Sequence, residues 1–388
     1  MSRVQQLVIR RFAQIEDASI ALRDLTFLVG PQATGKSLAL QLLTLAYDGP
    51  RIARSLDDLG YSWSDGKEFA YHYFGEGMEN AWSTETDIRL GAWKIGLPRR
   101  KAPLGRSEGS VFYIPAHRTL TIAEGLPREF RRYSPDTPYV VKQFSEQLRL
   151  MMQRGLGRGG AALFPQDRHL TGAVRDKIDG AVFHGAELRV QVSGLQRRLM
   201  LSVGSSGNLP YMAWTAGQRE FIPLLLGLYY LLPLGRQPKR DPVELVIVEE
   251  PEMGLHPDGV MAVLLPILAL LGRGYRVVVS THSPLVIDLA WALGALRGTP
   301  RGSRLLCEAF DLPNPRHDVI NMMERALACS TSVVYFDYQA DGRVRSKDIS
   351  ELDPSSDDEG VRYWGGLTRW SSRFAEVVGT AANGRKGG

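Results

Sequence analysis

Short apolar runs separated by polar and glycine-containing segments predict the buried strands of an α/β protein. Residues 25–29, 243–248 and 275–280 are largely apolar and rich in β-branched side chains, a pattern typical of strands covered on both faces. The two longest apolar stretches, 221–234 and 260–271, are shorter than the roughly 20 residues that a membrane span requires. We therefore expect a soluble protein with no membrane partner.

A glycine-rich loop follows the first of these strands and precedes the helix-forming residues 38–43. Its sequence GPQATGKS fits the pattern GxxxxGK[ST] of a P-loop, in which backbone N–H groups and a helix N-terminus bind phosphate oxygens. In this motif the lysine reaches the β- and γ-phosphates and the final hydroxyl binds magnesium. We predict a nucleoside triphosphate site formed by Gly30, Pro31, Gln32, Ala33, Thr34, Gly35, Lys36 and Ser37, with Ser37 as a ligand of Mg²⁺.

Polar side chains follow the second and third strands. Glu249 and Glu250 end the second strand, and ligands of open α/β sheets bind at the carboxyl ends of the strands. Consecutive strand residues point to opposite faces, so the two carboxylates can serve different purposes. We assign Glu249 to the magnesium ion, directly or through water, and Glu250 to the attacking water as general base. His282 is expected to bind the γ-phosphate, and the alternative is a histidine satisfied locally.

The order of these motifs resembles that of a known group of ATPases. After the P-loop come EEPE at 249–252, GLHP at 254–257 and STHSP at 280–284, and the opening residues 8–26 are similar to a pair of strands. The set resembles the ABC-type ATPase heads of the SMC, RecF and OLD (overcoming lysogenization defect) class, over residues 1–290. It is most similar to the OLD-like AAA family ATPases of bacterial anti-phage defence, such as the PARIS- and Septu-type subunits. The resemblance implies that the nucleotide is ATP and that it is hydrolysed.

The resemblance also implies a signature segment that contacts the nucleotide bound by another subunit. The segment we assign to this role precedes the apolar helix that begins near Phe221 and consists of Thr215, Ala216, Gly217 and Gln218. An ordinary capped helix is the alternative. A second candidate, SGLQ at 193–196, lies in an alternating pattern and is expected to form a hairpin instead.

Two further segments take roles only from the resemblance. Gly254, Leu255 and His256 look like the D-loop that crosses the dimer seam in such heads, although His256 is equally suited to cap a helix. Arg118 ends the stretch IPAHR, which resembles a segment of OLD-like ATPases and would place its side chain near the nucleotide or at the Q-loop position.

The motif positions divide the chain into four expected parts. Residues 1–60 form the first part of the head with the P-loop, and 61–205 form an inserted β and helical lobe. Residues 206–300 form the second part of the head, and 301–388 are an extension with an acidic loop. The fold class is thus α/β, a P-loop NTPase with a β-rich N-terminal lobe and a helical insertion. Residues 37–215 lack the sustained heptads of the coiled coil found in SMC-type heads.

The net charge of +5 is unevenly distributed along the sequence. Residues 94–203 contain 19 Lys and Arg against nine Asp and Glu, so an anionic partner such as DNA or a phage protein is expected there. The alternative is that these arginines are solvated separately, because a charge excess does not place the charges on one face.

The remaining composition bears on location and partners. Cys307 and Cys329 form no disulfide framework or metal spacing, and the N-terminus has no signal peptide pattern, so a cytoplasmic protein is expected. The residues after His282 contain no Asp-x-Asp sequence, which the TOPRIM nuclease domain of OLD-type proteins would need. A nuclease would have to be a separate partner.

We expect a switch or clamp whose heads form a homo-oligomer around ATP and whose hydrolysis of ATP controls an effector, a nuclease or a toxin, in anti-phage defence. The alternative is a DNA repair or recombination clamp of RecF type. A transporter subunit is disfavoured because the LSGGQ sequence is missing, and a phosphotransferase because Glu250 with His282 suits activation of water.

Overall fold

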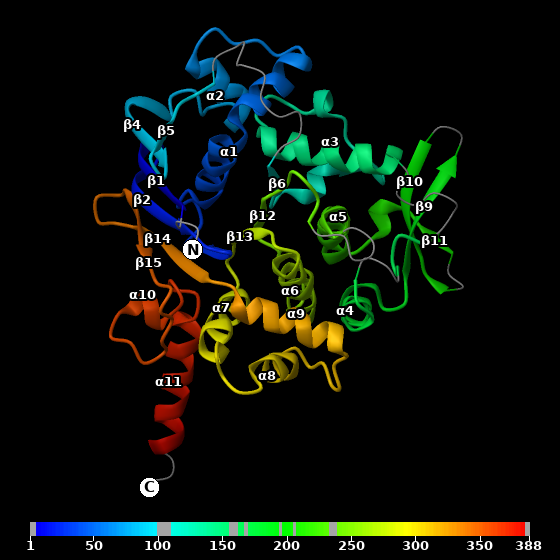
Figure 1. The fold of residues 1–388 in the computed structure, drawn as a ribbon, viewed down its shortest axis with the longest axis vertical. Coiled ribbons are helices and arrows are strands. Elements are labelled where there is room, and N and C mark those ends of the chain that lie inside the picture. Colours follow the sequence, from blue (N-terminus) through cyan, green and yellow to red (C-terminus); the bar gives the residue numbers. More distant parts are fainter. Residues whose placement is uncertain are drawn as a thin grey trace.

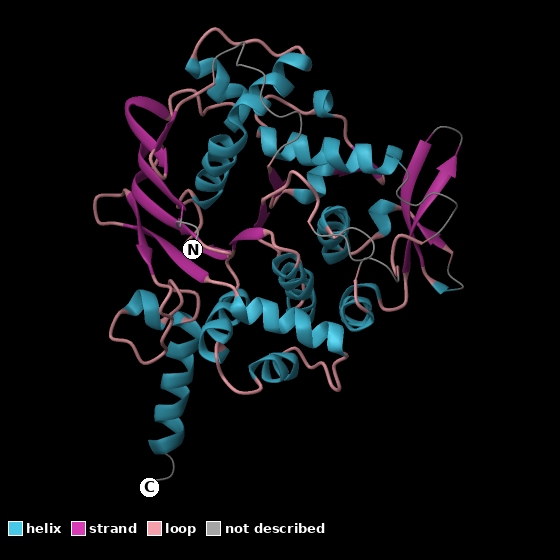
Figure 2. Ribbon diagram, in the orientation of Figure 1, coloured by secondary structure: helices cyan, strands magenta, loops and turns pink. Residues whose placement is uncertain are grey.

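The apolar runs of the sequence form neighbouring strands of one large sheet. The structure is a computed structural model that describes residues 5–98, 110–154, 162–166, 170–193, 196–204, 207–232 and 239–384. A ten-stranded sheet lies at the centre, and helices cover both of its faces (Figure 1; Figure 2). The predicted α/β fold class is confirmed.

The five strands at one side of the sheet run parallel. Strand β3 lies between β14 and β13, and β12 lies between β13 and β6. Their carboxyl ends therefore meet at one edge of the sheet. In spatial order the ten strands are β5 (Trp93–Ile95), β4 (Trp82–Leu90), β1 (Gln5–Phe12), β2 (Ile15–Leu22), β15 (Val344–Asp348), β14 (Thr331–Tyr338), β3 (Leu25–Val29), β13 (Arg276–Ser280), β12 (Leu245–Glu249) and β6 (Val111–Ile114).

Alternate side chains of the central strands enter two separate apolar clusters. In β12, Leu245 and Ile247 belong to the cluster that contains the leucines of α1 (Lys36–Asp58). Val246 and Val248 belong to the cluster on the other face. Two-sided burial explains why this strand is continuously apolar rather than alternating. The helices that contribute side chains to this second cluster include α5 (Ala216–Leu231), α6 (Pro257–Gly272), α7 (Pro284–Leu296) and α9 (His317–Ala328).

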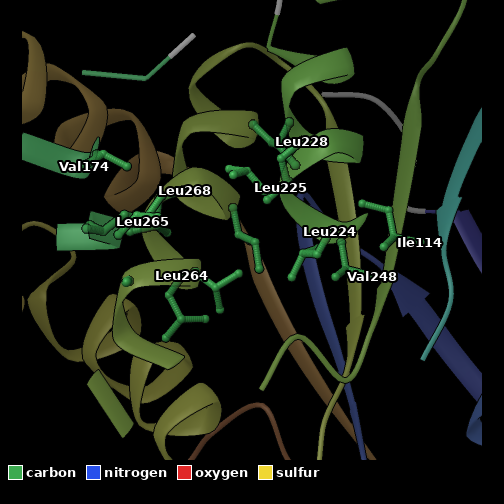
Figure 3. Packing of buried hydrophobic residues seen from close by; sticks show 14 of the residues in the cluster. Ile114, Val174, Leu224, Leu225, Leu228, Val248, Leu264, Leu265 and Leu268 are labelled. Atoms are coloured by element: carbon green, nitrogen blue, oxygen red, sulfur yellow. The ribbon is translucent and has the colours of Figure 1, made fainter. Parts of the chain in front are cut away.

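Leucines fill the space between the sheet and these helices. Figure 3 shows Leu224 of α5 beside Val248 of the sheet, Leu228 further along the same helix, and Leu264 and Leu268 of α6 on the other side of α5 from Val248. All of these side chains are at most 1% exposed. The start of α5, which carries the expected signature segment, is thereby fixed relative to the end of β12.

The segment 61–205 is divided between the main sheet and a separate lobe. Its strands β4, β5 and β6 belong to the ten-stranded sheet. The lobe carries a three-stranded sheet, in which β9 and β10 pair antiparallel with Ser193 opposite Gln196, so the predicted hairpin is confirmed. The elements of this segment outside the main sheet are α2 (Gly66–Phe74), the short pair β7 (Ile122–Ala123) and β8 (Leu126–Pro127), α3 (Tyr139–Arg154), α4 (Gly172–Ile178) with a π-helical turn at Asp179–Phe183, β9 (Glu187–Ser193) and β10 (Gln196–Ser202); β11 (Asn208–Leu209) completes the lobe's sheet.

The residues after 300 do not form a separate extension. Strand β14 is parallel to β3 and lies directly beside it, and β15 joins β14 to β2. The boundary expected at residue 300 therefore separates strands of one sheet. The apolar residues 331–338 form β14, which covers one edge of β3. The other elements here are α8 (Gly302–Ala309), α10 (Glu359–Arg362) and α11 (Arg369–Gly384), and α11 extends away from the sheet (Figure 1).

Among the helices of the described ranges, none combines the length and the apolar character that crossing a membrane would take.

Candidate active site at the carboxyl edge of the sheet

The P-loop curves around the carboxyl end of β3. Gly30 has φ 142°, Gly35 has φ 88° and Ala33 has φ 59°, so three of its residues lie in the region that favours glycine. A Cβ atom at Gly30 would stand 2.2 Å from the carbonyl oxygen of Phe336 in β14. Only glycine fits this approach, and the C-terminal strand therefore forms one wall of the loop.

Two side chains from outside the motif hold the loop at Ala33. Its carbonyl oxygen accepts hydrogen bonds from Nε2 of Gln14, at 2.9 Å, and from the hydroxyl of Tyr338, at 2.8 Å. Gln14 lies between β1 and β2, and Tyr338 is the last residue of β14. Nothing in the local pattern of either segment indicates a contact with the loop, so these two residues could not be predicted from the sequence.

Lys36 is buried at the centre of the loop. Its side chain is 6% exposed, and Nζ donates to the carbonyl oxygens of Gly30 and Pro31, both at 2.8 Å. Burial lowers the pKa of Lys36 to about 8, and the carboxylates of Glu250, Glu252 and Glu249 oppose this shift. The ammonium group thus donates to two neutral carbonyl oxygens, and three nearby carboxylates favour its charged form.

Glu249 and Ser37 are brought together as expected of a magnesium site. Glu249 is 5% exposed, and its Oε2 accepts from the amide of Ala116 at 3.1 Å. Burial raises the pKa of Glu249, while the Ser37 hydroxyl, the Ala116 amide and the Tyr113 hydroxyl lower it. Its other oxygen, Oε1, is buried and has no hydrogen-bond partner among the described residues. A buried carboxylate oxygen without a partner, beside a hydroxyl, fits a hard divalent cation.

The described residues contain no group of three or more His, Cys, Asp and Glu side chains arranged to hold a metal ion. Magnesium commonly takes one or two protein ligands and completes its shell with phosphate oxygens and water. The metal role expected for Ser37 and Glu249 stays a prediction.

Glu250 and His282 face each other at the open side of the site. His282 Nε2 lies 3.6 Å from Oε1 of Glu250, and each side chain is about one quarter exposed, at 25% and 27%. Burial and the neighbouring Lys36 lower the pKa of His282, so its ring is neutral at pH 7. Glu250 has φ 43°, an uncommon conformation for this residue type. Its amide donates to the carbonyl of Ser280 at 2.8 Å, which holds the residue beside β13.

Arg118 is fully buried behind Glu250. Its guanidinium donates to the carbonyl oxygens of Pro115, Glu220, Glu249 and Glu250, at 2.7 to 3.3 Å. The carboxylate of Glu220 lies 3.7 Å from its Nε. The contact with a nucleotide that we expected for Arg118 stays a prediction, whereas the side chain joins the end of β12 to the start of α5.

The expected signature and D-loop segments lie against each other on the surface. Thr215 and Gln218 form a reciprocal capping box at the start of α5, which is the geometry of a capped helix. A Cβ atom at Gly217 would stand 2.8 Å from the carbonyl oxygen of Gly254. His256 is exposed and caps α6, with Nδ1 3.4 Å from the amide of Asp258. Their contact with a second subunit stays a prediction.

Glu252 lies in the candidate site but was not among the residues predicted from the sequence. Its Oε1 accepts from the hydroxyl of Thr281 at 2.7 Å and from the amide of His282 at 2.6 Å. Its Oε2 is buried and has no hydrogen-bond partner within the described ranges. Burial raises the pKa of Glu252, and these hydrogen bonds lower it. The third acid of EEPE was a signal that could have identified it.

About half of the described cations in residues 94–203 form ion pairs with acids. The cations at 99, 100, 101, 106, 158 and 168 lie outside the described residues. Arg118 and Lys142 are buried. The remaining pairs include Lys94 with Asp87, Arg132 with Glu129, Arg149 with Glu146, Arg175 with Asp176, Lys177 with Asp311 and Arg189 with Glu187.

Comparison with known proteins supports the P-loop ATPase class. Residues 160–288 match a family described as "AAA domain, putative AbiEii toxin, Type IV TA system". This range includes the signature segment, Glu249, Glu250 and His282, and it lies after the P-loop. A comparison with curated proteins found no match.

Solved structures similar to this chain include two SMC heads. The SMC head domain from Thermotoga maritima is 12% identical, with 89% of this chain and 98% of that chain covered and a TM-score of 0.35. The SMC head bound to the C-winged helix domain of ScpA is 9% identical, with 89% and 97% covered and a TM-score of 0.40.

Proposed function

We propose that this protein is an ATP-hydrolysing switch whose heads associate around ATP and control an effector protein. The observation that carries the proposal is the convergence of Lys36, Ser37, Glu249, Glu250 and His282 at one edge of the sheet. These side chains come from three parallel strands and the segments that follow them. A P-loop lysine, a magnesium-binding pair and a carboxylate beside a neutral histidine are the parts that phosphoryl transfer to water requires.

The P-loop would hold the triphosphate of ATP. Lys36 would exchange its two carbonyl acceptors for phosphate oxygens, and a charged acceptor gives a stronger hydrogen bond than a neutral one. Ser37 and Glu249 would hold Mg²⁺, directly or through water. The ion, when bound, neutralises charge on the β- and γ-phosphates.

Glu250 would act on the attacking water. Its carboxylate is accessible and accepts the proton that water loses as its oxygen bonds to phosphorus. His282, neutral at pH 7, has one N–H that can donate to the γ-phosphate while Glu250 holds the water. The carbonyl contact with Arg118 keeps the backbone of Glu250 in place during this step.

The surface position of Thr215, Ala216, Gly217 and Gln218 supports pairing of two heads. These residues lie at a helix N-terminus, where backbone N–H groups favour an anion such as the γ-phosphate of a second subunit. By resemblance to OLD-like ATPases, the setting would be anti-phage defence with a nuclease or toxin as effector. The description of the matched family as a putative toxin of a toxin–antitoxin system supports such a setting.

A DNA clamp of RecF type is the second candidate. The cation excess of residues 94–203 favours it, and the local pairing of these cations with acids weakens it. A clamp predicts duplex DNA binding that weakens steeply with salt. Lack of binding at low salt would remove this candidate.

Phosphate release from ATP with Mg²⁺ tests the proposed function. We expect hydrolysis by the wild type, loss of nucleotide binding in Lys36→Ala, and a loss of about 100-fold or more in Glu250→Gln with binding retained. Glu250→Gln should also accumulate as an ATP-bound oligomer on a sizing column. The matched control Glu244→Gln changes an exposed acid at the other end of β12 and should hydrolyse ATP like the wild type. The same elution volume for all variants with and without ATP would contradict the association of heads.

A further inference from the structure

We propose that Glu252 is a positioning residue that holds His282 in place opposite Glu250, so that hydrolysis depends on it and nucleotide binding does not. The inference rests on the proposed function, because it assigns a further residue to the same reaction. Glu252 itself does not contact the reacting atoms in this assignment. It acts through the backbone of the segment that carries His282.

The hydrogen bonds of Glu252 begin where the pairing of two strands ends. Strands β12 and β13 are in register up to Glu249 and Ser280, and the amide of Glu250 still donates to the carbonyl of Ser280. Beyond this point the chains separate. The carboxylate of Glu252 then supplies the acceptor for the amide of His282, at 2.6 Å, which continues the connection for two more residues.

Thr281 makes the connection stiffer. It is fully buried, its amide donates to the carbonyl of Leu28 in β3, and its hydroxyl donates to Glu252 at 2.7 Å. The same hydroxyl accepts from the amide of Ser283 at 2.9 Å. One carboxylate thereby fixes three consecutive residues, with His282 in the middle.

The direction of the Glu252 side chain is itself fixed by a tight turn. The amide of Met253 donates to the carbonyl of Glu250, and the amide of Leu255 donates to the carbonyl of Glu252, both at 3.0 Å. Pro251 precedes Glu252 and restricts the backbone further. The turn therefore holds the base Glu250 and the anchor Glu252 as one rigid unit.

The arrangement sets the distance between the two groups that handle water and phosphate. Oε1 of Glu250 and Nε2 of His282 are 3.6 Å apart, and both backbones are tied to the same turn. Without the carboxylate of Glu252, the amide of His282 would lose its acceptor and the ring would gain freedom to move. A displacement of about 1 Å at a reacting group can lower a rate by about 100-fold. The P-loop is held by other contacts, at Gly30 and Ala33, so ATP binding should remain.

The experiment compares the steady-state ATPase parameters of the full chain with the binding of a non-hydrolysable ATP analogue. We expect Glu252→Ala to lower kcat by about 10- to 100-fold, with analogue affinity within threefold of the wild type. Thr281→Val keeps the shape of the side chain and removes its hydrogen bonds, so we expect a smaller loss of about 3- to 10-fold. Glu252→Gln retains an acceptor oxygen and should recover part of the rate that Glu252→Ala loses.

The control is Glu244→Ala, which removes an acid at the opposite end of β12 and should leave kcat unchanged. Combining Glu252→Ala with Glu250→Gln should cost less than the product of the two single effects, because both act on the same step. If Glu252→Ala fails to fold, Thr281→Val carries the test.

The outcomes separate the two hypotheses. A wild type that does not hydrolyse ATP overturns the proposed function and this inference with it. A wild type that hydrolyses ATP, together with Glu252→Ala and Thr281→Val at wild-type kcat, overturns only the role of Glu252. A fall in analogue affinity that equals the fall in kcat, with a matching loss of thermal stability, would also overturn it, since it would indicate a purely structural residue.

Discussion

The carboxyl edge of the sheet and the inserted lobe both carry many charges, but they hold them differently. At the edge, Arg118 and Glu249 are at most 5% exposed and bond mainly to backbone groups of distant segments. In the lobe, Arg132 is 74% exposed and Arg189 is 46% exposed, and each pairs with an acid two or three residues away. Burial with long-range backbone partners thus distinguishes a candidate site from a charged surface, whatever the count of charges.

The sharpest test of this difference is the loss of one arginine from each region. Arg118→Met should lower the free energy of unfolding by about 3–5 kcal/mol, because it leaves Glu220 without its charge partner and four carbonyl oxygens without their donor. Arg132→Met should change it by less than about 0.5 kcal/mol. Urea unfolding of the two variants measures both values. Equal losses would contradict the comparison.

A second test compares two glycines with positive φ. Gly30→Ala places a methyl group 2.2 Å from the carbonyl oxygen of Phe336 and should cost about 2–3 kcal/mol of stability. Gly77, in the segment after α2, has φ 88° and no atom within 4 Å of an added Cβ, so Gly77→Ala should cost about 1 kcal/mol from backbone strain alone. Thermal unfolding distinguishes them. A smaller loss at Gly30 would show that β14 yields to the added methyl group.

The smallest expected effect concerns the pH dependence of nucleotide binding. The pKa of Lys36 is about 8, so raising the pH from 7 to 9 removes the ammonium charge that attracts phosphate. We expect the affinity for an ATP analogue to fall by about tenfold over this range, measured by fluorescence titration. Lys36→Arg should bind with little pH dependence because arginine stays protonated.

The matched control for this titration is a second buried lysine. Burial also lowers the pKa of Lys142, which lies in α3 and does not contact the loop. In Lys142→Met the affinity for the ATP analogue should therefore still fall by about tenfold between pH 7 and pH 9. An affinity that does not change with pH in Lys142→Met, or one that falls with pH in Lys36→Arg, would assign the pH dependence to another group.

The candidate site could be predicted from the sequence because its parts are local patterns. The P-loop, the acids after β12 and the histidine after β13 each follow a short apolar run, and parallel strands bring such positions to one edge of a sheet. The structure brings these segments together as expected. The hairpin at Ser193 and Gln196 was predictable for the same reason, since alternation is a local signal.

Contacts between distant segments could not be predicted in the same way. The hydroxyl of Tyr338 donates to the carbonyl oxygen of Ala33, which is 305 residues away in the sequence. Arg118 donates to the carbonyl oxygen of Glu250, which is 132 residues away. No spacing in the sequence reports such partners. The domain boundary expected at residue 300 differs from the structure for the same reason. The apolar residues 331–338 indicate a strand, but they do not indicate that its neighbour in the sheet is β3.

The placement of β14 has a consequence for the synthesis of the protein on the ribosome. The strand that carries the P-loop ends at Val29, yet both of its neighbours in the sheet, β13 and β14, are encoded after residue 275. At about 5–20 residues per second, roughly 15–60 s pass between translation of β3 and translation of Tyr338. Until β13 is made, the apolar strand has neither partner, and α1, the β1 and β2 pair or a chaperone would have to cover it. The candidate nucleotide site therefore combines residues from among the first to be made with residues from among the last.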